Sequence, residues 1–167
     1  MPSIQRVTPC LWFDHEAEEA ARFYVSIFKN SKLGNVARYT EAGREIHGRP
    51  PGSAMTVAFE LDGQEFIALN GGPVFKFNEA VSLMVNCDTQ EEVDYYWEKL
   101  SQGGDEQAQQ CGWLKDKYGL SWQVVPAALG KLMSGSLPGG PQRAMQAMLK
   151  MRKLDIEQLG RAYEGKA

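Results

Sequence analysis

The sequence has few of the side chains from which most metal, disulfide and nucleic-acid sites are built. Its 167 residues hold two histidines and three cysteines, and the cysteines Cys10, Cys87 and Cys111 form no CxxC pair. This spacing argues against a disulfide framework and favours the reducing cytoplasm. The net charge of −3 provides no positive field for nucleic acid or an anionic membrane. We therefore expect a cytoplasmic protein that binds neither.

Long apolar runs are also missing, so the sequence predicts no membrane span and no secretory signal. Hydrophobic residues make up 43% of the chain and charged residues 23%, which is typical of a globular protein. The length is that of about one ordinary domain, which can bury a core without disulfides or metals.

A weak internal repeat organises the first three quarters of the chain. The stretches LWFDHEAEEAARFYVSIF and VSLMVNCDTQEEVDYYWEKL align at an offset of about 72 to 74 residues. Each reads as a strand followed by a helix with an acidic first turn, which suits the positive end of the helix dipole. We expect Asp14 to cap the first helix, and Asp88, with Glu91 three residues later, to cap the second. Pro9 predicts that the strand over residues 5–13 is an edge strand or contains a bulge.

The clearest local pattern is a hairpin in AMTVAFELDGQEFIALNGG, with Asp62-Gly63 as its two-residue turn. This turn places Phe59 opposite Phe66 and Val57 opposite Ala68, and it puts Asn70 at the end of a mostly apolar face. Glu60 then lies on the opposite face from Asn70, so we do not nominate it as a general base.

The chain changes character after Pro126, where a linker rich in Gly, Ser and Pro precedes two amphipathic helices. Asp155 is the expected cap of the last helix, with Gln158 at its third position. The predicted fold class is α+β, with two tandem βαβββ modules over residues 1–77 and 78–130. A linker and helical tail over residues 131–167 complete one structural domain.

Several stretches together resemble a known family: TPCLWFD, TVAFELDGQEFIALNGGP, VNCDTQEEVDYYWEKL, CGWLKDKYGLSWQVVP and AMLKMRKLDI. They are similar to the PhnB-like branch of the vicinal oxygen chelate superfamily, the glyoxalase, bleomycin-resistance and dioxygenase fold. Members of this branch often carry the label 3-demethylubiquinone-9 3-methyltransferase. The resemblance implies that each module's sheet curls into half of a cup, and that the protein is a homodimer.

Metal-binding members of this superfamily place four ligands on the inward faces of the first and last strands. By resemblance these positions fall at or near Thr8, Asn70, Ser82 and Gln123. All four side chains are neutral and are poor ligands for a transition metal. We therefore expect no divalent metal and no other cofactor.

The predicted ligand site consists of cup-facing side chains, namely Thr8, Cys10, Trp12, Asn70, Ser82, Met84 and Gln123. Two alternatives remain open for Asn70 and Gln123. Their amides either bond to each other or to backbone where the modules meet, or they orient a small organic molecule in the cup. Trp12 and Met84 are either core fillers or a wall for the ligand. Cys10 has no evident base nearby, which favours an inert core cysteine.

The resulting hypothesis is a small-molecule-binding protein, or an enzyme of undefined reaction, with a metal-free cup. One alternative is a metal-dependent lyase or dioxygenase that uses His47 or glutamates from loops. Another is methyl transfer, although the Gly-Gly pairs that begin at residues 71, 103 and 139 do not join a strand to a helix. A third is a docking role for the tail helices.

Overall fold

The computed structural model describes residues 4–166, and the chain divides into two compact units, residues 1–76 and 77–167. The first unit contains β1 (Cys10–Phe13), α1 (Ala17–Ile27), β2 (Lys32–Arg38), α2 (Arg44–His47), β3 (Ala54–Leu61) and β4 (Gln64–Asn70). The second contains β5 (Ser82–Cys87), α3 (Gln90–Ser101), the 3-10 turn η1 (Glu106–Ala108), β6 (Trp113–Lys115), β7 (Ser121–Pro126), α4 (Ala127–Met133), α5 (Gly140–Met148) and α6 (Ile156–Glu164). Along residues 4–166, no helix is both long and apolar enough to cross a membrane.

The first unit is a complete βαβββ module whose sheet has the order β1-β4-β3-β2. Strands β3 and β4 form the predicted hairpin, with Phe59 opposite Phe66 and Val57 opposite Ala68. Asp62 and Gly63 have φ angles of 46° and 83°, as a two-residue turn that matches the strand twist requires. The predicted register is confirmed.

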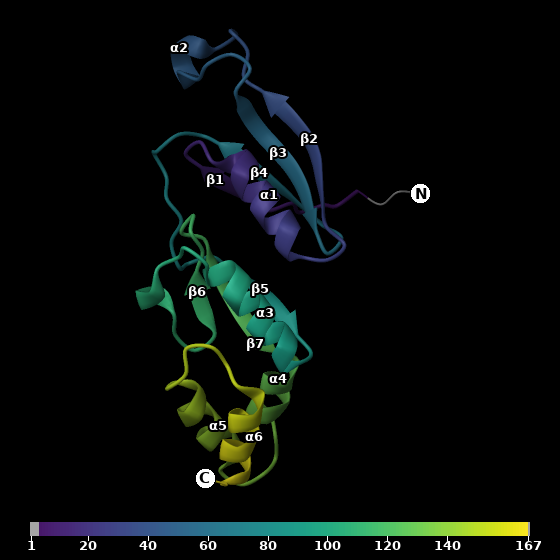
Figure 1. Ribbon diagram of the computed structural model, residues 1–167, viewed down its shortest axis with the longest axis vertical. Coiled ribbons are helices and arrows are strands. Elements are labelled where there is room, and N and C mark those ends of the chain that lie inside the picture. The colour runs from purple at the N-terminus through teal and green to yellow at the C-terminus, as the bar shows by residue number, and fades with distance from the viewer. Residues whose placement is uncertain (1–3, 167) are drawn as a thin grey trace. The chain divides into compact units, whose positions relative to one another are not determined.

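Helix α1 covers one face of this sheet (Figure 1). The ring of Tyr24 stacks on Phe59 with 6.2 Å between centroids, and Phe59 stacks on Phe66 at 5.3 Å. Alternate residues of each strand share this buried face with them, namely Leu11, Phe13, Val57, Leu61 and Ala68. The face that α1 does not cover is called the open face of the first sheet. It carries Cys10, Trp12, Thr56, Ala58, Glu60, Glu65, Ile67 and Leu69.

Strand β1 is shorter than the predicted strand over residues 5–13. It begins at Cys10, directly after Pro9. Proline has no N–H to contribute to a ladder, although its carbonyl can still accept. The carbonyl of Pro9 accepts from the N–H of Ile67 at 2.9 Å. Strand β1 lies at the edge of the sheet, as Pro9 predicted.

The second unit repeats this plan with one strand fewer among its described residues. Its sheet has the order β5-β7-β6, with β5 parallel to β7. Between α3 and β6 the chain forms η1 and an isolated bridge between Gln110 and Trp113, where a full βαβββ module would have a further strand. Here the carboxylate of Asp105 accepts from the N–H of Gln107 at 2.9 Å. Such local side-chain to backbone bonds compete with a sheet ladder.

The second sheet also has a face covered by its helix, which is α3 (Figure 1). The covered face holds Val85, Cys87, Leu114, Trp122 and Val124. The open face of the second sheet is the other one, and it carries Ser82, Met84, Asn86, Trp113, Lys115, Ser121, Gln123 and Val125.

The N-cap of helix α3 lies one residue after Asp88, the predicted cap. Thr89 is the N-cap, and its hydroxyl accepts from the N–H of Glu92 at 3.2 Å. The carboxylate of Glu92 accepts in return from the N–H of Asp88 at 2.7 Å. Asp88 and Thr89 are adjacent, and both residue types can cap a helix. The prediction that Asp88 is the cap is wrong.

The C-terminal helices are part of the core of the second unit. Leu154 and Leu159 are fully buried. The side chain of Gln90 in α3 accepts from the N–H of Ile156 at 2.8 Å and donates to the carbonyl of Leu154 at 3.1 Å. Asp155 caps α6 as predicted, accepting from the N–H of Gln158 at 2.8 Å.

Candidate functional site

The register of β1 decides which way Asn70 points. Trp12 of β1 lies opposite Leu69 of β4, and Phe13 lies opposite Asn70. Residues paired in register share a face, so Trp12 and Asn70 lie on opposite faces of the sheet. Phe13 is buried on the face that α1 covers. The prediction that Asn70 faces the cup beside Trp12 is therefore wrong.

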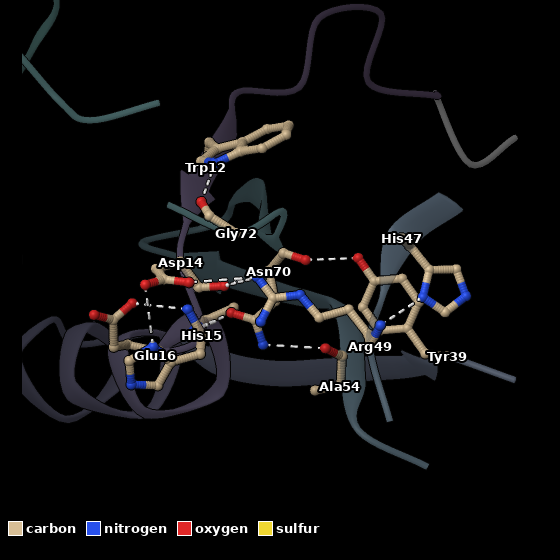
Figure 2. A network of polar contacts seen from close by, with 11 residues as sticks. Trp12, Asp14, His15, Glu16, Tyr39, His47, Arg49, Ala54, Asn70 and Gly72 are labelled. Carbon is tan, nitrogen blue, oxygen red and sulfur yellow. Dashed lines mark hydrogen bonds and ion pairs between the residues drawn. The ribbon is translucent and has the colours of Figure 1, made fainter. Parts of the chain in front are cut away.

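The amide of Asn70 is bonded to backbone at both ends. Its Oδ1 accepts from the N–H of Ala17 at 2.8 Å, and its Nδ2 donates to the carbonyl of Ala54 at 3.0 Å (Figure 2). Ala17 is the first residue of α1, and the residue before it, Glu16, makes no side-chain cap bond. Asn70 thus satisfies an N–H that the helix cannot pair itself. This is the backbone alternative of the two that the sequence left open.

Asp14, the predicted cap of α1, is engaged elsewhere. Its carboxylate lies 3.3 Å from the guanidinium of Arg49, which also donates to the Asp14 carbonyl at 2.8 Å (Figure 2). The local sequence could not reveal this, because the side chain that replaces Asp14 at the helix is 53 residues away in sequence from Ala17.

A cleft of about 390 Å³ opens at this end of α1, lined by His15, Glu18, Arg49, Pro50, Ser53, Ala54 and Asn70. Most of its polar side chains already bond within the protein: Arg49 to Asp14, Asn70 to Ala17 and Ala54, Ser53 to Pro50, and Glu18 to Arg22. Groups that are paired internally have less to offer a ligand. We interpret the cleft as a structural junction rather than as the ligand site.

Trp12 lies on the open face of the first sheet and is held firmly. Its Nε1 donates to the carbonyl of Gly72 at 2.9 Å (Figure 2). The indole lies so close to Gly71 that a side chain at that position would clash with it. Phe75 meets the ring edge to face with 4.9 Å between centroids. A fixed aromatic surface of this kind suits the wall of a binding site.

Glu60 also lies on the open face of the first sheet. Glu60 lies on the opposite face from Asn70, as predicted, but it is Asn70 that lies under α1 and Glu60 that faces away from the helix. The carboxylate of Glu60 forms an ion pair with Lys32 at 3.4 Å. Both residues line a depression of about 130 Å³.

Cys10 and Thr8 fit the predicted site less well. Cys10 is exposed on the edge strand, so it is not a core cysteine. Partial burial of its thiol raises the pKa of Cys10, which keeps the thiol protonated at neutral pH and makes it a poor nucleophile. Thr8 lies before β1 begins, and its hydroxyl accepts from the side chain of Gln5 at 3.3 Å.

In the second unit, the three predicted residues Ser82, Met84 and Gln123 all lie on the open face. Met84 is 55% exposed. The Nε2 of Gln123 donates to the hydroxyl of Ser82 at 2.9 Å. Strand β6 adds two residues to this face that the sequence analysis missed: Trp113 lies opposite Gln123, and Lys115 lies opposite Ser121. Their strict alternation with buried Leu114 is the signal that could have found them.

The turn before β7 fixes the direction in which Gln123 points. Asp116 is 2% exposed, and its carboxylate accepts from the N–H groups of Tyr118 and Leu120 at 2.8 and 3.1 Å. The same carboxylate accepts from the indole Nε1 of Trp122 at 2.8 Å. Because Trp122 is held in the core, the next residue, Gln123, must point to the open face.

The side chains at the superfamily's metal positions do not fit a transition metal. Asn70 points under α1, while Thr8, Ser82 and Gln123 present hydroxyl and amide groups, which are weak ligands for such ions. Along residues 4–166, no three His, Cys, Asp or Glu side chains are grouped so that they could hold a metal ion.

Residues 5–125 match the family model of 3-demethylubiquinone-9 3-methyltransferase. The chain belongs to this family. The PhnB protein from Bacillus cereus is 38% identical, over 74% of this chain and 100% of that one, and its solved structure gives a TM-score of 0.64. The matched residues end before α4 begins.

A more distant solved structure shares the fold of this 3-demethylubiquinone-9 3-methyltransferase family member. Protein PA1353 from Pseudomonas aeruginosa is 18% identical, over 74% of this chain and 98% of that one, with a TM-score of 0.56. A glyoxylase/bleomycin resistance protein/dioxygenase domain from Frankia sp. EAN1pec is 15% identical, over 74% and 93%, with a TM-score of 0.47. No curated protein sequence matches the chain.

Proposed function

We propose that this protein binds a small organic molecule on the open faces of its sheets, without a transition metal. The observation that carries the proposal is the state of Gln123. Its Nε2 is bonded to Ser82, whereas its Oε1 accepts from no described residue and lies on a partly exposed face. An amide held in place with one end free is suited to orient a ligand by its hydrogen bonds.

The neighbours of Gln123 support this proposal. Met84 and Trp113 flank it in register on the two adjacent strands, and both present apolar surface. Ligand sites are typically apolar with a few placed polar groups, which is the composition of this row. In the first unit, Trp12 offers a comparable fixed aromatic surface.

The label of the family suggests methyl transfer as a second candidate. A usual S-adenosylmethionine site has a glycine-rich turn that joins a strand to a helix, and no glycine pair of the described residues does so. Gly71-Gly72 follows β4 and leads into residues without a helix, and Gly103-Gly104 follows α3. Gly139-Gly140 does open a helix, α5, but it follows α4 rather than a strand. A calorimetric titration with S-adenosylmethionine is expected to show no micromolar binding, and a micromolar constant would favour methyl transfer.

The proposed function is tested by nuclear magnetic resonance titration of ¹⁵N-labelled protein with a set of small aromatic and aliphatic fragments. We expect bound fragments to shift the side-chain amide of Gln123 and the indole N–H of Trp113 or Trp12. The indole N–H of Trp122, which is buried against Asp116, is the internal control and should not move. Shifts confined to the cleft beside His15, or no shifts with any fragment, would contradict the proposal.

A further inference from the structure

Ser121 has a buried hydroxyl that no hydrogen bond explains. The residue is 1% exposed, and its Oγ has no partner among the described residues. Buried polar groups are nearly always paired, so an exception calls for an absent partner such as a ligand or a water molecule. The strand register shows which side chains lie beside Ser121 and could contact the same partner.

Ser121 is the middle residue of a polar row that crosses the open face of the second sheet. Ser82 lies opposite it on β5, and Lys115 lies opposite it on β6. Adjacent strands are about 4.8 Å apart, so a carboxylate placed over Ser121 lies within one strand spacing of both Ser82 and Lys115. Ser82 accepts from Gln123, which leaves its own O–H free to donate. The row therefore offers two hydroxyl donors and one ammonium group.

The ammonium group of Lys115 forms an ion pair with Glu79, a carboxylate that another anion can displace. Nζ of Lys115 contacts Oε1 of Glu79, and the side chains are 26% and 62% exposed, respectively. Glu79 belongs to the residues between β4 and β5, which form neither helix nor strand. The Glu79 side of this ion pair is exposed to solvent, which weakens it, so another anion can compete with Glu79 for Lys115. Glu79 also leaves the hydroxyl of Ser121 unpaired.

We propose that Ser82, Ser121 and Lys115 bind the carboxylate of a small organic acid, and that Glu79 occupies Lys115 until this acid displaces it. The inference rests on the proposed function, because it names the ligand class for the same face. An incoming carboxylate makes the ion pair that Glu79 makes, and it also accepts from Ser121, which Glu79 does not.

The charge and the apolar surface on the open face of the second sheet narrow the class of ligand further. One ammonium group balances one negative charge, whereas a phosphate monoester brings about −1.5 to −2. The next row, Met84, Gln123 and Trp113, provides apolar surface around one free amide oxygen. That oxygen can accept from a hydroxyl of the ligand. The ligand class is thus a hydroxylated carboxylic acid with an apolar or aromatic body.

The test compares 4-hydroxybenzoate with its uncharged counterpart, 4-hydroxybenzamide, by calorimetry and nuclear magnetic resonance on the full chain. The wild type should bind the acid about tenfold more tightly, as expected for a charge-assisted contact. Lys115→Gln should remove this preference. Lys117→Gln makes the same change of charge two residues away, outside β6, and should retain it.

Glu79→Gln tests the displacement itself, because it removes the competing carboxylate from an exposed position. The variant should bind 4-hydroxybenzoate about two- to fivefold more tightly and 4-hydroxybenzamide with unchanged affinity, since an exposed ion pair is weak. Ser121→Ala should fold normally and weaken binding of the acid alone.

The outcomes separate this inference from the proposed function. Equal affinity for both probes, with shifts at Gln123, would overturn the carboxylate inference and leave the proposed function intact. Unchanged acid affinity in Glu79→Gln would overturn the displacement by Glu79. Absence of binding of either probe to wild type and Glu79→Gln would overturn the inference, and the fragment titration would then decide the fate of the proposed function separately.

Discussion

The two units follow one plan, yet their terminal strands use an amide side chain in opposite ways. In the first unit, Asn70 at the end of β4 turns under α1 and bonds to Ala17 and Ala54. In the second, Gln123 in β7 turns away from α3, and among the described residues its side chain bonds to Ser82 alone. A shift of one residue along a strand reverses the face of a side chain. Similar residues at similar positions in a repeat can therefore serve the core in one copy and the surface in the other.

The largest expected effect is a loss of unfolding free energy when the core of the second unit, which includes the C-terminal helices, is disrupted. Leu154 is fully buried in the second unit, and the first unit has no part of the C-terminal helices in it. Leu154→Ala should lower the free energy of unfolding by about 2 to 5 kcal/mol, the usual cost of a large cavity. Urea unfolding measures it, and a change below ~1 kcal/mol would show that the tail is not part of the core.

The next prediction compares the two amides directly. Asn70→Ala leaves the N–H of Ala17 and the carbonyl of Ala54 without their partner, so it should cost about 1 to 3 kcal/mol of unfolding free energy. Gln123→Ala removes one partly exposed bond and should cost less than about 0.5 kcal/mol. Equal costs for the two variants in urea unfolding would abolish the distinction between a structural and a ligand-facing amide.

A smaller effect is expected at the turn that aims Gln123. Asp116→Asn keeps one acceptor oxygen and replaces the other by an NH₂ donor. This donor must face another donor, either the backbone N–H groups of Tyr118 and Leu120 or the indole N–H of Trp122. We expect a loss of about 1 to 2 kcal/mol and a shift of the tryptophan emission. Glu106→Gln, at an exposed position of η1, serves as the control for the change of charge. Unchanged emission would show that Asp116 does not hold Trp122.

The smallest effect is the acid sensitivity of the second unit. A hydrogen bond from Lys153, followed by one from Gln90, lowers the pKa of Asp94 in the folded protein below its ordinary value. A lowered folded pKa stabilises the fold above the unfolded pKa, and this contribution is lost as the pH falls through the folded pKa. The stability difference between wild type and Asp94→Asn should thus be full above about pH 5 and shrink below about pH 4. A difference that does not vary with pH would contradict the role of the carboxylate.

Local patterns were enough to predict much of the fold. The Asp62-Gly63 turn fixed the register of β3 and β4, and the Asp155 cap fixed the start of α6, because each depends on residues within a few positions. The family and its fold class also followed from contiguous stretches; the match over residues 5–125 confirms the family, and the two mixed sheets with their helices confirm the α+β class.

The site was harder to predict because it depends on pairings between distant strands. The face of Asn70 follows from the parallel pairing of β1 with β4, which no local pattern reveals. The same applies to the cap of α1, where a distant amide replaces the nearby Asp14. In contrast, Ser82, Met84 and Gln123 were placed on one face correctly, because their positions depend only on the alternation within β5 and β7 and on one register. Whether that face binds a ligand stays a prediction.

The most direct test of the account is the affinity of Gln123→Ala for 4-hydroxybenzoate, measured by calorimetry beside its urea unfolding midpoint. We predict that affinity falls about tenfold, the equivalent of one lost hydrogen bond to the ligand, while the midpoint stays within error of the wild type. An unchanged affinity, or a loss of affinity that only accompanies a lower midpoint, would contradict a ligand-facing role for Gln123.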